Sequence, residues 1–422
     1  MSAVPSLRLI WLVAIVAFPA AILHSLAILG GLAIVIVADL LLRRDAVRVE
    51  MPGLSRSFKD RTGEIRVRAR GSSAQRVRIG IAAPEGIDSE DEEQTIDLPA
   101  GDSEFVWRYT PRRRGKYRIG ECFVESATRL GLWNVRRRQE LDCELRVYPN
   151  LRRPGDLRAL KRGAEGLHAV RQMGRGREFE KLREYIPGDG FDEIHWKATA
   201  RRGRPVTKVF QIERTQEVYA IIDASRLAAR AVGEETALER AITSGLILGA
   251  AAERRGDLFG LAAFSHQIEA FARARNGKAH YAACRDAIYQ LHPRQTSPDF
   301  EEIATFLRLR LRRRAMLLFL TSLDDPVLAE NFSRATKLLA SRHLVLAAML
   351  RPASVGPLFE DERVNSANDI YRRLAGHLAW KRLKETETAL ARQGVRLAVL
   401  DPENFGASLV ALYDEVKQRQ LL

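Results

Sequence analysis

The chain has 422 residues, of which 46% are hydrophobic and 29% are charged, so it is too long for one ordinary domain and too apolar to be disordered. Its formal net charge of +15 is compatible with nucleic acid, an anionic membrane surface or an acidic protein as a partner, and it selects none of them. Three scattered cysteines are too few for a disulfide framework or a cysteine-rich zinc site.

The first apolar stretch, Leu9 to Leu42, contains Asp39 as its single charged residue. It exceeds the ~20 residues that one spanning helix needs and is interrupted between Pro19 and Ser25, so it predicts a transmembrane helical hairpin over residues 1–44. Arginines flank both ends of the stretch, which predicts an inner (cytoplasmic) membrane protein whose soluble domains face the cytoplasm. The alternative is a secretory signal peptide, which the second apolar run disfavours because it follows at once.

Residues 45–150 contain short runs in which apolar and polar residues alternate, as in RVRIGI at 76–81. Turn residues separate these runs, and this pattern predicts an antiparallel β-sandwich domain. The acidic stretch 88–93 and the basic stretch 112–114 are interpreted as solvated loops between strands. No catalytic constellation is found in this part of the sequence.

Residues 218–422 alternate between apolar runs and longer segments with helical spacing, which predicts an α/β doubly wound domain with a mostly parallel sheet. No glycine-rich turn or phosphate-loop lysine follows the first strand, so a nucleotide site is not supported. The predicted strands are Val218–Ile222, Phe259–Phe264, Met316–Leu320, Leu344–Met349 and Val395–Leu400.

Polar residues follow the most apolar strands of this predicted sheet. Asp223 and Ser225 come after the first strand, Asp324 comes after the Met316–Leu320 strand, and Thr296 lies in the loop between. Ligands of doubly wound sheets bind at the carboxyl ends of the strands, and hard oxygen atoms are the ligands that Mg²⁺ prefers. Alternatively, the aspartates and Ser225 only cap the helices that follow them.

Residues 151–217 contain two distinctive runs, EFEKLREYIPGD at 178–189 and IHWKATAR at 194–201. These runs closely resemble the signature of the bacterial family called domain of unknown function 58. The resemblance implies a von Willebrand factor A-like domain over 218–422, preceded by a membrane hairpin and a β-rich segment. It also implies a MoxR-type AAA ATPase as a partner in the assembly or maturation of other proteins.

Von Willebrand A domains bind a divalent ion through Asp-x-Ser-x-Ser after the first strand, a threonine in a second loop and an aspartate in a third. Asp223 and Ser225 match the first two positions, while Thr296 and, loosely, Asp324 match the other loops. Leu227 stands at the last serine position and cannot ligate a metal. The resemblance therefore implies a degenerate metal-ion-dependent adhesion site at Asp223, Ser225 and Thr296, with weak Mg²⁺ binding or none.

The leading hypothesis is a membrane-anchored protein-interaction adapter that is not an enzyme and has no catalytic residues or cofactor. We expect the signature to pack on the sheet domain through apolar side chains such as those of Ile186 and Trp196. The expected docking surface combines the loops of the sheet edge with the signature, through residues Asp223, Ser225, Thr296, Asp324, Asp189, His195, Trp196, Lys197 and Arg201.

Three alternatives remain open at this point. One is a divalent-metal-dependent phosphoryl-transfer enzyme that uses Asp223 and Asp324. A hydrolase with Asp189 and His195 as acid and base is less favoured, because no nucleophile has a suitable spacing. The third is a nucleic-acid-binding protein, but the basic run at 308–314 alternates with leucine and lacks aromatic residues, so no nucleic acid is expected.

Overall fold

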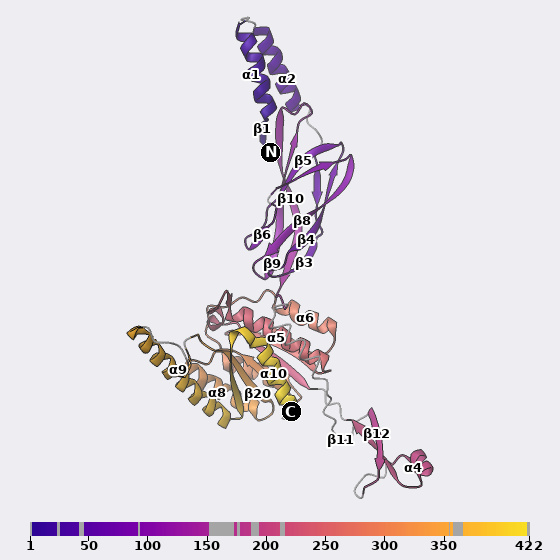
Figure 1. Ribbon diagram of the computed structural model, residues 1–422, viewed down its shortest axis with the longest axis vertical. Helices are drawn as coiled ribbons and strands as arrows, with labels where there is room; N and C mark the ends of the chain where they lie inside the picture. The colour runs from indigo at the N-terminus through magenta and orange to yellow at the C-terminus, as the bar shows by residue number, and fades with distance from the viewer. Residues whose placement is uncertain are drawn as a thin grey trace. The chain divides into compact units, whose positions relative to one another are not determined.

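The computed structural model describes residues 2–22, 26–41, 46–91, 93–151, 173–174, 178–186, 194–211, 216–353, 355–357 and 366–419. The chain divides into two compact units, Met1–Asn150 and Leu151–Leu422 (Figure 1). The first unit is rich in antiparallel β-structure, and the second contains the two longest helices of the described residues.

The first unit begins with a short strand and two helices, β1 (Ser2–Pro5), α1 (Leu7–Ile22) and α2 (Leu26–Leu41). Each helix has 16 residues. At 1.5 Å per residue this gives a length of about 24 Å, whereas a bilayer core is about 30 Å thick. Among the residues that the structure describes, no helix combines the length and the apolar character needed to cross a membrane. The predicted transmembrane hairpin is therefore wrong. The expected fold class loses this element, and the N-terminal region is instead part of a unit rich in antiparallel β-structure.

Asp39, the single charged residue of the apolar stretch, has a structural role within this unit. Its side chain is 1% exposed and accepts hydrogen bonds from the hydroxyl of Thr128 and from the backbone N–H groups of Leu130 (2.8 Å) and Leu132 (3.2 Å). The indole N–H of Trp133 donates to the carbonyl of Ile36 in α2 at 3.1 Å. These bonds hold the end of α2 to the 128–132 loop.

Two β-sheets make up the rest of the first unit. One has the order β1-β10-β9-β5-β7 with β3 parallel to β10, and the other has the order β2-β4-β8-β6; the remaining pairs are antiparallel. Alternate residues of both sheets face a shared core that includes Val67, Ile79 and Trp107. The strand bounds are β2 Arg48–Glu50, β3 Leu54–Phe58, β4 Gly63–Gly71, β5 Gln75–Ile81, β6 Ile87–Ser89, β7 Glu93–Leu98, β8 Gly101–Pro111, β9 Gly115–Ala127 and β10 Trp133–Tyr148.

The second unit contains a six-stranded sheet with the order β18-β17-β14-β19-β20-β21. All of its pairs are parallel except β17 with β18. Its inner strands are mostly apolar because helices cover both faces. The bounds are β14 Glu217–Asp223, β17 Leu258–Phe264, β18 Ile268–Arg275, β19 Ala315–Leu320, β20 Leu344–Leu350 and β21 Val395–Leu400.

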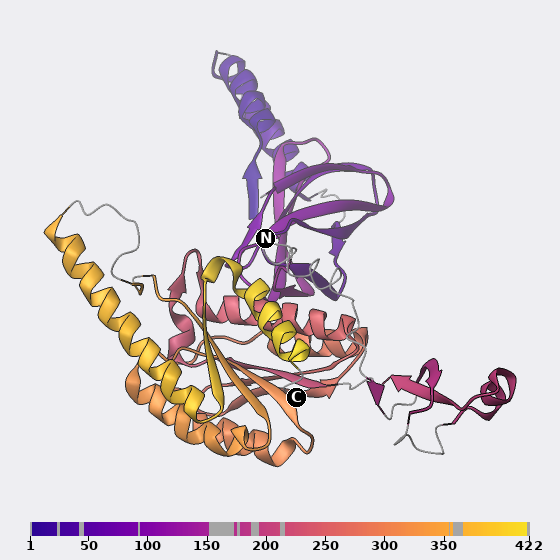
Figure 2. The ribbon, with the colours of Figure 1, turned by 60° about the horizontal axis from the view of Figure 1, so that its bottom comes forward.

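Helices cover both faces of this sheet (Figure 2), and each face has its own core. Along β14, Val218, Ala220 and Ile222 contact one helix layer, and Tyr219 and Ile221 contact the other. The first layer comprises α5 (Ala237–Arg254), α6 (Lys278–Ile288) and α10 (Phe405–Gln418). The second layer comprises α7 (Phe300–Arg310), α8 (Pro326–Ala340) and α9 (Ala367–Arg392).

His343, in the turn between α8 and β20, is 3% exposed, and neither ring nitrogen has a hydrogen-bond partner among the described residues. Burial, together with Arg342 and Arg314, lowers the pKa of its imidazole below the usual value near 6.5. The unfolded chain therefore binds the proton more readily than the folded one. Stability from this group is complete above the unfolded pKa and is lost as the pH falls below it.

We expect the free energy of unfolding of the second unit to fall between about pH 7.5 and pH 5, by up to about 1.4 kcal/mol for each pH unit below the unfolded pKa. Its thermal midpoint should fall over the same range. The variant His343→Leu should show a smaller fall over the same range, because it has no titratable ring. Melting curves of both proteins across this range measure the difference. Parallel pH profiles would show that His343 does not contribute.

Candidate functional site

The centre of the second unit's sheet places Asp223 at the carboxyl end of β14. β14 lies between β17 and β19, and the chain crosses from one side of β14 to the other between these strands. Such a position is where doubly wound sheets bind ligands. The backbone after β14 is fixed by a hydrogen bond from the N–H of Ala224 to the carbonyl of Phe264 at 2.7 Å.

The carboxyl group of Asp223 is buried, with 2% of the residue exposed. Its Oδ1 accepts a hydrogen bond from the backbone N–H of Ser225 at 2.8 Å, and its Oδ2 accepts one from the hydroxyl of Thr321 at 2.6 Å. Burial raises the pKa of Asp223, and the hydrogen bonds from Thr321 and Ser225 oppose this shift. The carboxyl group thus connects the loops that follow β14 and β19.

Hydrogen bonds of the backbone bring the loops that carry Ser225 and Thr296 next to Asp223. Ser225 is fully buried, and its Oγ accepts a hydrogen bond from Leu227 N at 3.3 Å, where it caps the short 3-10 helix η2 (Arg226–Ala229). The backbone N–H of Arg226 donates to the carbonyl of Thr296 at 2.9 Å. The hydroxyl of Thr296 is buried and has no hydrogen-bond partner among the described residues. The structure therefore brings these loops together, as the sequence predicted.

Asp324 lies apart from this group. Its carboxylate forms an ion pair with Arg230 at 2.9 Å, and the preceding residue, Leu323, is buried in the core. The polar residue that β19 presents to Asp223 is Thr321, which the sequence analysis did not single out. Its position directly after the Met316–Leu320 run was the available signal, because the first residue after a parallel strand lies at the same edge as Asp223.

A small cavity of about 30 Å³ opens beside Asp223. That volume holds one or two water molecules, whereas ligand sites usually offer about 300–1,000 Å³. Its lining is mostly apolar, and Leu227 contributes to it where the resemblance implied a metal-binding serine. The lining residues are Asp223, Leu227, Ala228, Ala237, Ala241, Leu320, Thr321, Ser322, Ala348, Leu350 and Phe405.

These residues do not fit a resident divalent cation. Both carboxylate oxygens of Asp223 accept hydrogen bonds, and Ser225 Oγ accepts one as well. Within the described ranges, no group of three or more His, Cys, Asp or Glu side chains has a metal-binding arrangement. A cation at this edge would have one buried carboxylate and neutral hydroxyls as ligands, a weak set for Mg²⁺. Weak or absent Mg²⁺ binding stays a prediction.

The signature forms a separate small module. Strands β11 (Met173–Gly174), β12 (Glu178–Glu184) and β13 (Val206–Gln211) pair in the order β11-β13-β12, and helix α4 (Trp196–Arg202) lies between β12 and β13 in the chain. Gly203, with a φ of +67°, ends the helix in the left-handed conformation. Ile194, which is 6% exposed, forms an isolated bridge with Thr207.

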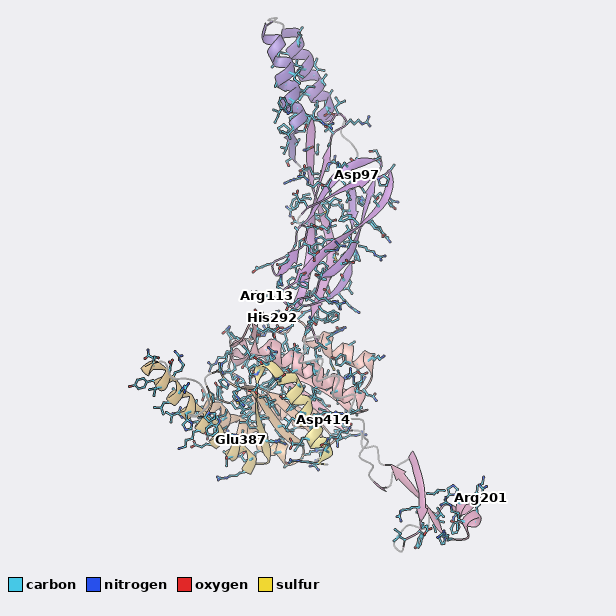
Figure 3. All side chains as sticks on the ribbon, in the orientation of Figure 1. Asp97, Arg113, Arg201, His292, Glu387 and Asp414 are labelled. Atoms are coloured by element: carbon cyan, nitrogen blue, oxygen red, sulfur yellow. The ribbon has the colours of Figure 1, made fainter. Side chains whose placement is uncertain are left out.

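His195 caps this helix, because its Nδ1 accepts a hydrogen bond from Ala198 N at 3.1 Å. That bond gives the imidazole a structural role, while Asp189, its expected acid–base partner, lies outside the described residues. Trp196 is 66% exposed and Ile186 is 57% exposed, so the expectation that these two side chains pack in a core is wrong. Lys197 and Arg201 are also exposed, and Figure 3 shows Arg201 on α4.

Comparisons with known proteins find the same family that the signature resembles. Residues 181–354 match the model of the family described as "Protein of unknown function DUF58". Over 113 residues the chain is 30% identical to "Uncharacterized protein YeaD" of Bacillus subtilis (strain 168). This alignment covers 26% of this chain and 28% of that protein. The aligned region therefore spans little more than a quarter of the relative. Together these matches show that part of the chain is similar to DUF58 proteins.

Solved structures add little. An aerotolerance-related membrane protein from Bacteroides fragilis NCTC 9343 is 14% identical, with 47% of this chain and 97% of that chain covered and a TM-score of 0.29. A protein of unknown function from Porphyromonas gingivalis W83 is 12% identical, with 34% and 61% covered and a TM-score of 0.20. Scores this low carry no argument about fold or function.

Proposed function

We propose that this chain is a protein-interaction adapter and that it binds its partner through the exposed side chains of the small signature module. We name the residues Ile186, Trp196, Lys197 and Arg201 the signature face. The observation that carries the proposal is the 66% exposure of Trp196. A tryptophan this exposed leaves a large apolar surface in water, which a protein partner would cover.

The chemistry of the signature face suits protein binding. Tryptophan and arginine are the residues most enriched where interfaces concentrate their binding energy. Lys197 and Arg201 are four residues apart on α4, so their charges lie on the same side of the helix. Arg204, just beyond the helix, pairs with Glu184 at 2.8 Å and leaves Lys197 and Arg201 to face a partner. The expected partner surface is an apolar pocket with a carboxylate rim.

The partner that the family resemblance implies is a MoxR-type AAA ATPase, with a shared role in the assembly or maturation of other proteins. We retain that ATPase as the proposed partner. The predicted inner-membrane location depended on a spanning hairpin, which is not found among the residues that the structure describes.

The sheet edge favours a binding protein over an enzyme. Asp223 and Ser225 are buried, and the adjacent cavity of about 30 Å³ is far smaller than a phosphoester substrate. Asp324 is held by Arg230 and is not part of the cavity lining. The phosphoryl-transfer alternative therefore has no paired carboxylates to support it among the described residues. Asp223, Ser225 and Thr321 instead fix the loops of the sheet edge.

The test is binding of the full chain to a purified MoxR-type AAA ATPase from the same organism, measured by interferometry. The variant Trp196→Ala should weaken binding by about 30-fold, because an interface tryptophan of this kind commonly contributes about 2 kcal/mol or more. The matched control is Tyr371→Ala, which removes an equally exposed aromatic ring from α9. The control should bind as the wild type does.

Four results would count against this proposal. Equal loss in both variants would show that exposed aromatic rings act non-specifically, and no binding by the wild type would remove the ATPase as the partner. Nucleic acid retained by the wild type and released by Lys197→Glu would favour the nucleic-acid alternative. Hydrolysis of a phosphoester that Asp223→Asn abolishes would favour the enzyme.

A further inference from the structure

The N-terminal half of α9 exposes a row of large apolar side chains. Ile370 is 54% exposed, Tyr371 72%, Leu374 45% and Leu378 49%. Their spacing places them on one side of the helix, over about two turns, and we name this row the α9 stripe. In Figures 1 and 2 this end of α9 extends away from the central sheet of the second unit. A row of this kind is unusual on a surface that contacts only water.

The core contacts of α9 lie on the other side of the helix. Leu383 is 7% exposed and Leu390 1%, and both pack in the core formed with α7 and α8. At 100° per residue these two positions point roughly opposite to the α9 stripe. The body of the unit therefore does not cover the stripe, and a flat surface can approach it without meeting the sheet.

Basic residues surround the α9 stripe. The segment 367–384 contains five basic residues and one acidic residue, which gives it a net charge of 5 − 1 = +4. The acidic residue, Asp369, forms an ion pair with Arg372 at 3.6 Å. Lys381 and Arg382 are exposed and lie three and four residues after Leu378, so they extend the apolar side by one turn. A second copy of the chain would bring the same cations against one another.

We infer that the N-terminal half of α9 binds an anionic lipid surface, with the α9 stripe in the headgroup region and Lys381 and Arg382 beside the phosphates. An amphipathic helix with a basic polar side lies in this way at a bilayer interface. The ring of Tyr371 suits that depth because its apolar body and its hydroxyl match the two sides of the interface. The stripe is convex and has the Tyr371 hydroxyl as its single polar side-chain group, which favours a fluid surface over a shaped protein groove.

The test requires a signal local to α9, because α1 and α2 also expose apolar side chains. Tyr371→Cys in the full chain can carry an environment-sensitive fluorophore. The native thiols of Cys122, Cys143 and Cys284 are buried, and burial raises their pKa to about 11, 11 and 12, so they do not compete for the label. The control site is Leu309→Cys on α7, where the leucine is 74% exposed.

The vesicles are phosphatidylcholine alone, or equal parts of phosphatidylcholine and phosphatidylglycerol. The label at 371 should shift to shorter wavelength with the anionic vesicles at low salt, and the label at 309 should not. The double change Lys381→Glu with Arg382→Glu should lower binding by more than about tenfold, since each basic residue near an anionic surface contributes about a factor of five.

Several outcomes would overturn the inference. One is a label at 371 that does not respond to either vesicle. Equal shifts with both vesicles, or a shift that survives the double charge reversal, would refute the anionic surface. A shift that grows with protein concentration in the absence of vesicles would show that a second copy covers the stripe. A shift produced by the ATPase partner in the absence of vesicles would assign the stripe to protein binding.

Discussion

Replacing Asp223 by alanine is expected to lower the free energy of unfolding by about 1–3 kcal/mol, because the substitution leaves a buried hydroxyl and a buried N–H group without their acceptor. The hydroxyl is that of Thr321 and the N–H group is that of Ser225, and both lose a bond to the same carboxyl group. Asp223 was expected on a docking surface, where its side chain would be exposed. Burial of Asp223 reverses that expectation.

The matched variant is Asp223→Asn, which keeps an acceptor for Ser225 N and removes the ionisable group. Since the folded pKa of Asp223 is raised, its contribution to stability is complete below the unfolded pKa and is lost as the pH rises. The asparagine variant should therefore be at least as stable as the wild type at neutral pH. Denaturant titrations of both variants measure these effects. An alanine variant as stable as the wild type would show that the hydrogen bonds at Asp223 contribute nothing.

Replacing Gly260 by alanine is expected to destabilise the second unit by about 2–3 kcal/mol through overpacking. A Cβ atom at Gly260, in β17, would lie 2.3 Å from Cε1 of Tyr219 and 2.9 Å from the backbone nitrogen of Ala274. Tyr219 cannot move aside easily, because its ring is buried and its hydroxyl accepts a hydrogen bond from Ala274 N at 3.1 Å. The loss should appear as a lower thermal midpoint.

The control for this prediction is Gly120→Ala in β9, where no atom lies within 4 Å of the added Cβ. It should change stability little. Equal midpoints for the two variants would mean that the ring of Tyr219 moves aside after all. The comparison also separates the cost of overpacking from the general effect of replacing a strand glycine, which acts in both variants.

Most strands of the second unit could be predicted because burial on both faces makes them mostly apolar. The run Val218–Ile222 lies within β14, and Val395–Leu400 coincides with β21. β18 was not predicted, since its sequence IEAFARAR mixes charged and apolar residues as an edge strand does. It also makes the one antiparallel pair of that sheet.

Strand length in the first unit was harder to predict than strand position. The alternating residues of Cys143–Tyr148 predict a strand, but β10 begins ten residues earlier, at Trp133. Its first part, with three consecutive arginines at 136–138, reads as a loop in sequence. In the structure these arginines lie on a long antiparallel pair with β9, where Arg136 and Arg138 form ion pairs with Glu125 and Glu121. Cross-strand charge pairs are not visible to local pattern analysis.

The candidate site was predictable only in part. The proximity of Asp223, Ser225 and Thr296 follows from sheet topology, whereas the depth of Asp223 does not, because it depends on how tightly three loops close over one carboxyl group. The error for Trp196 was the reverse, because this side chain was expected to be packed and is exposed. A tryptophan is usually buried, and nothing in the local spacing shows that α4 is too short to bury it.

Asp39 imposes an order on the folding of the first unit during synthesis. Its hydrogen-bond donors, at Thr128, Leu130 and Leu132, lie 89 to 93 residues further along the chain. At a translation rate of about 5–20 residues per second, α2 leaves the ribosome several seconds before those donors exist. Until then the carboxylate keeps its water, so the helical hairpin cannot reach its final packing ahead of the strands that follow it. A ribosome stalled before residue 128 would therefore hold a chain whose first helices are complete in sequence and unfinished in structure.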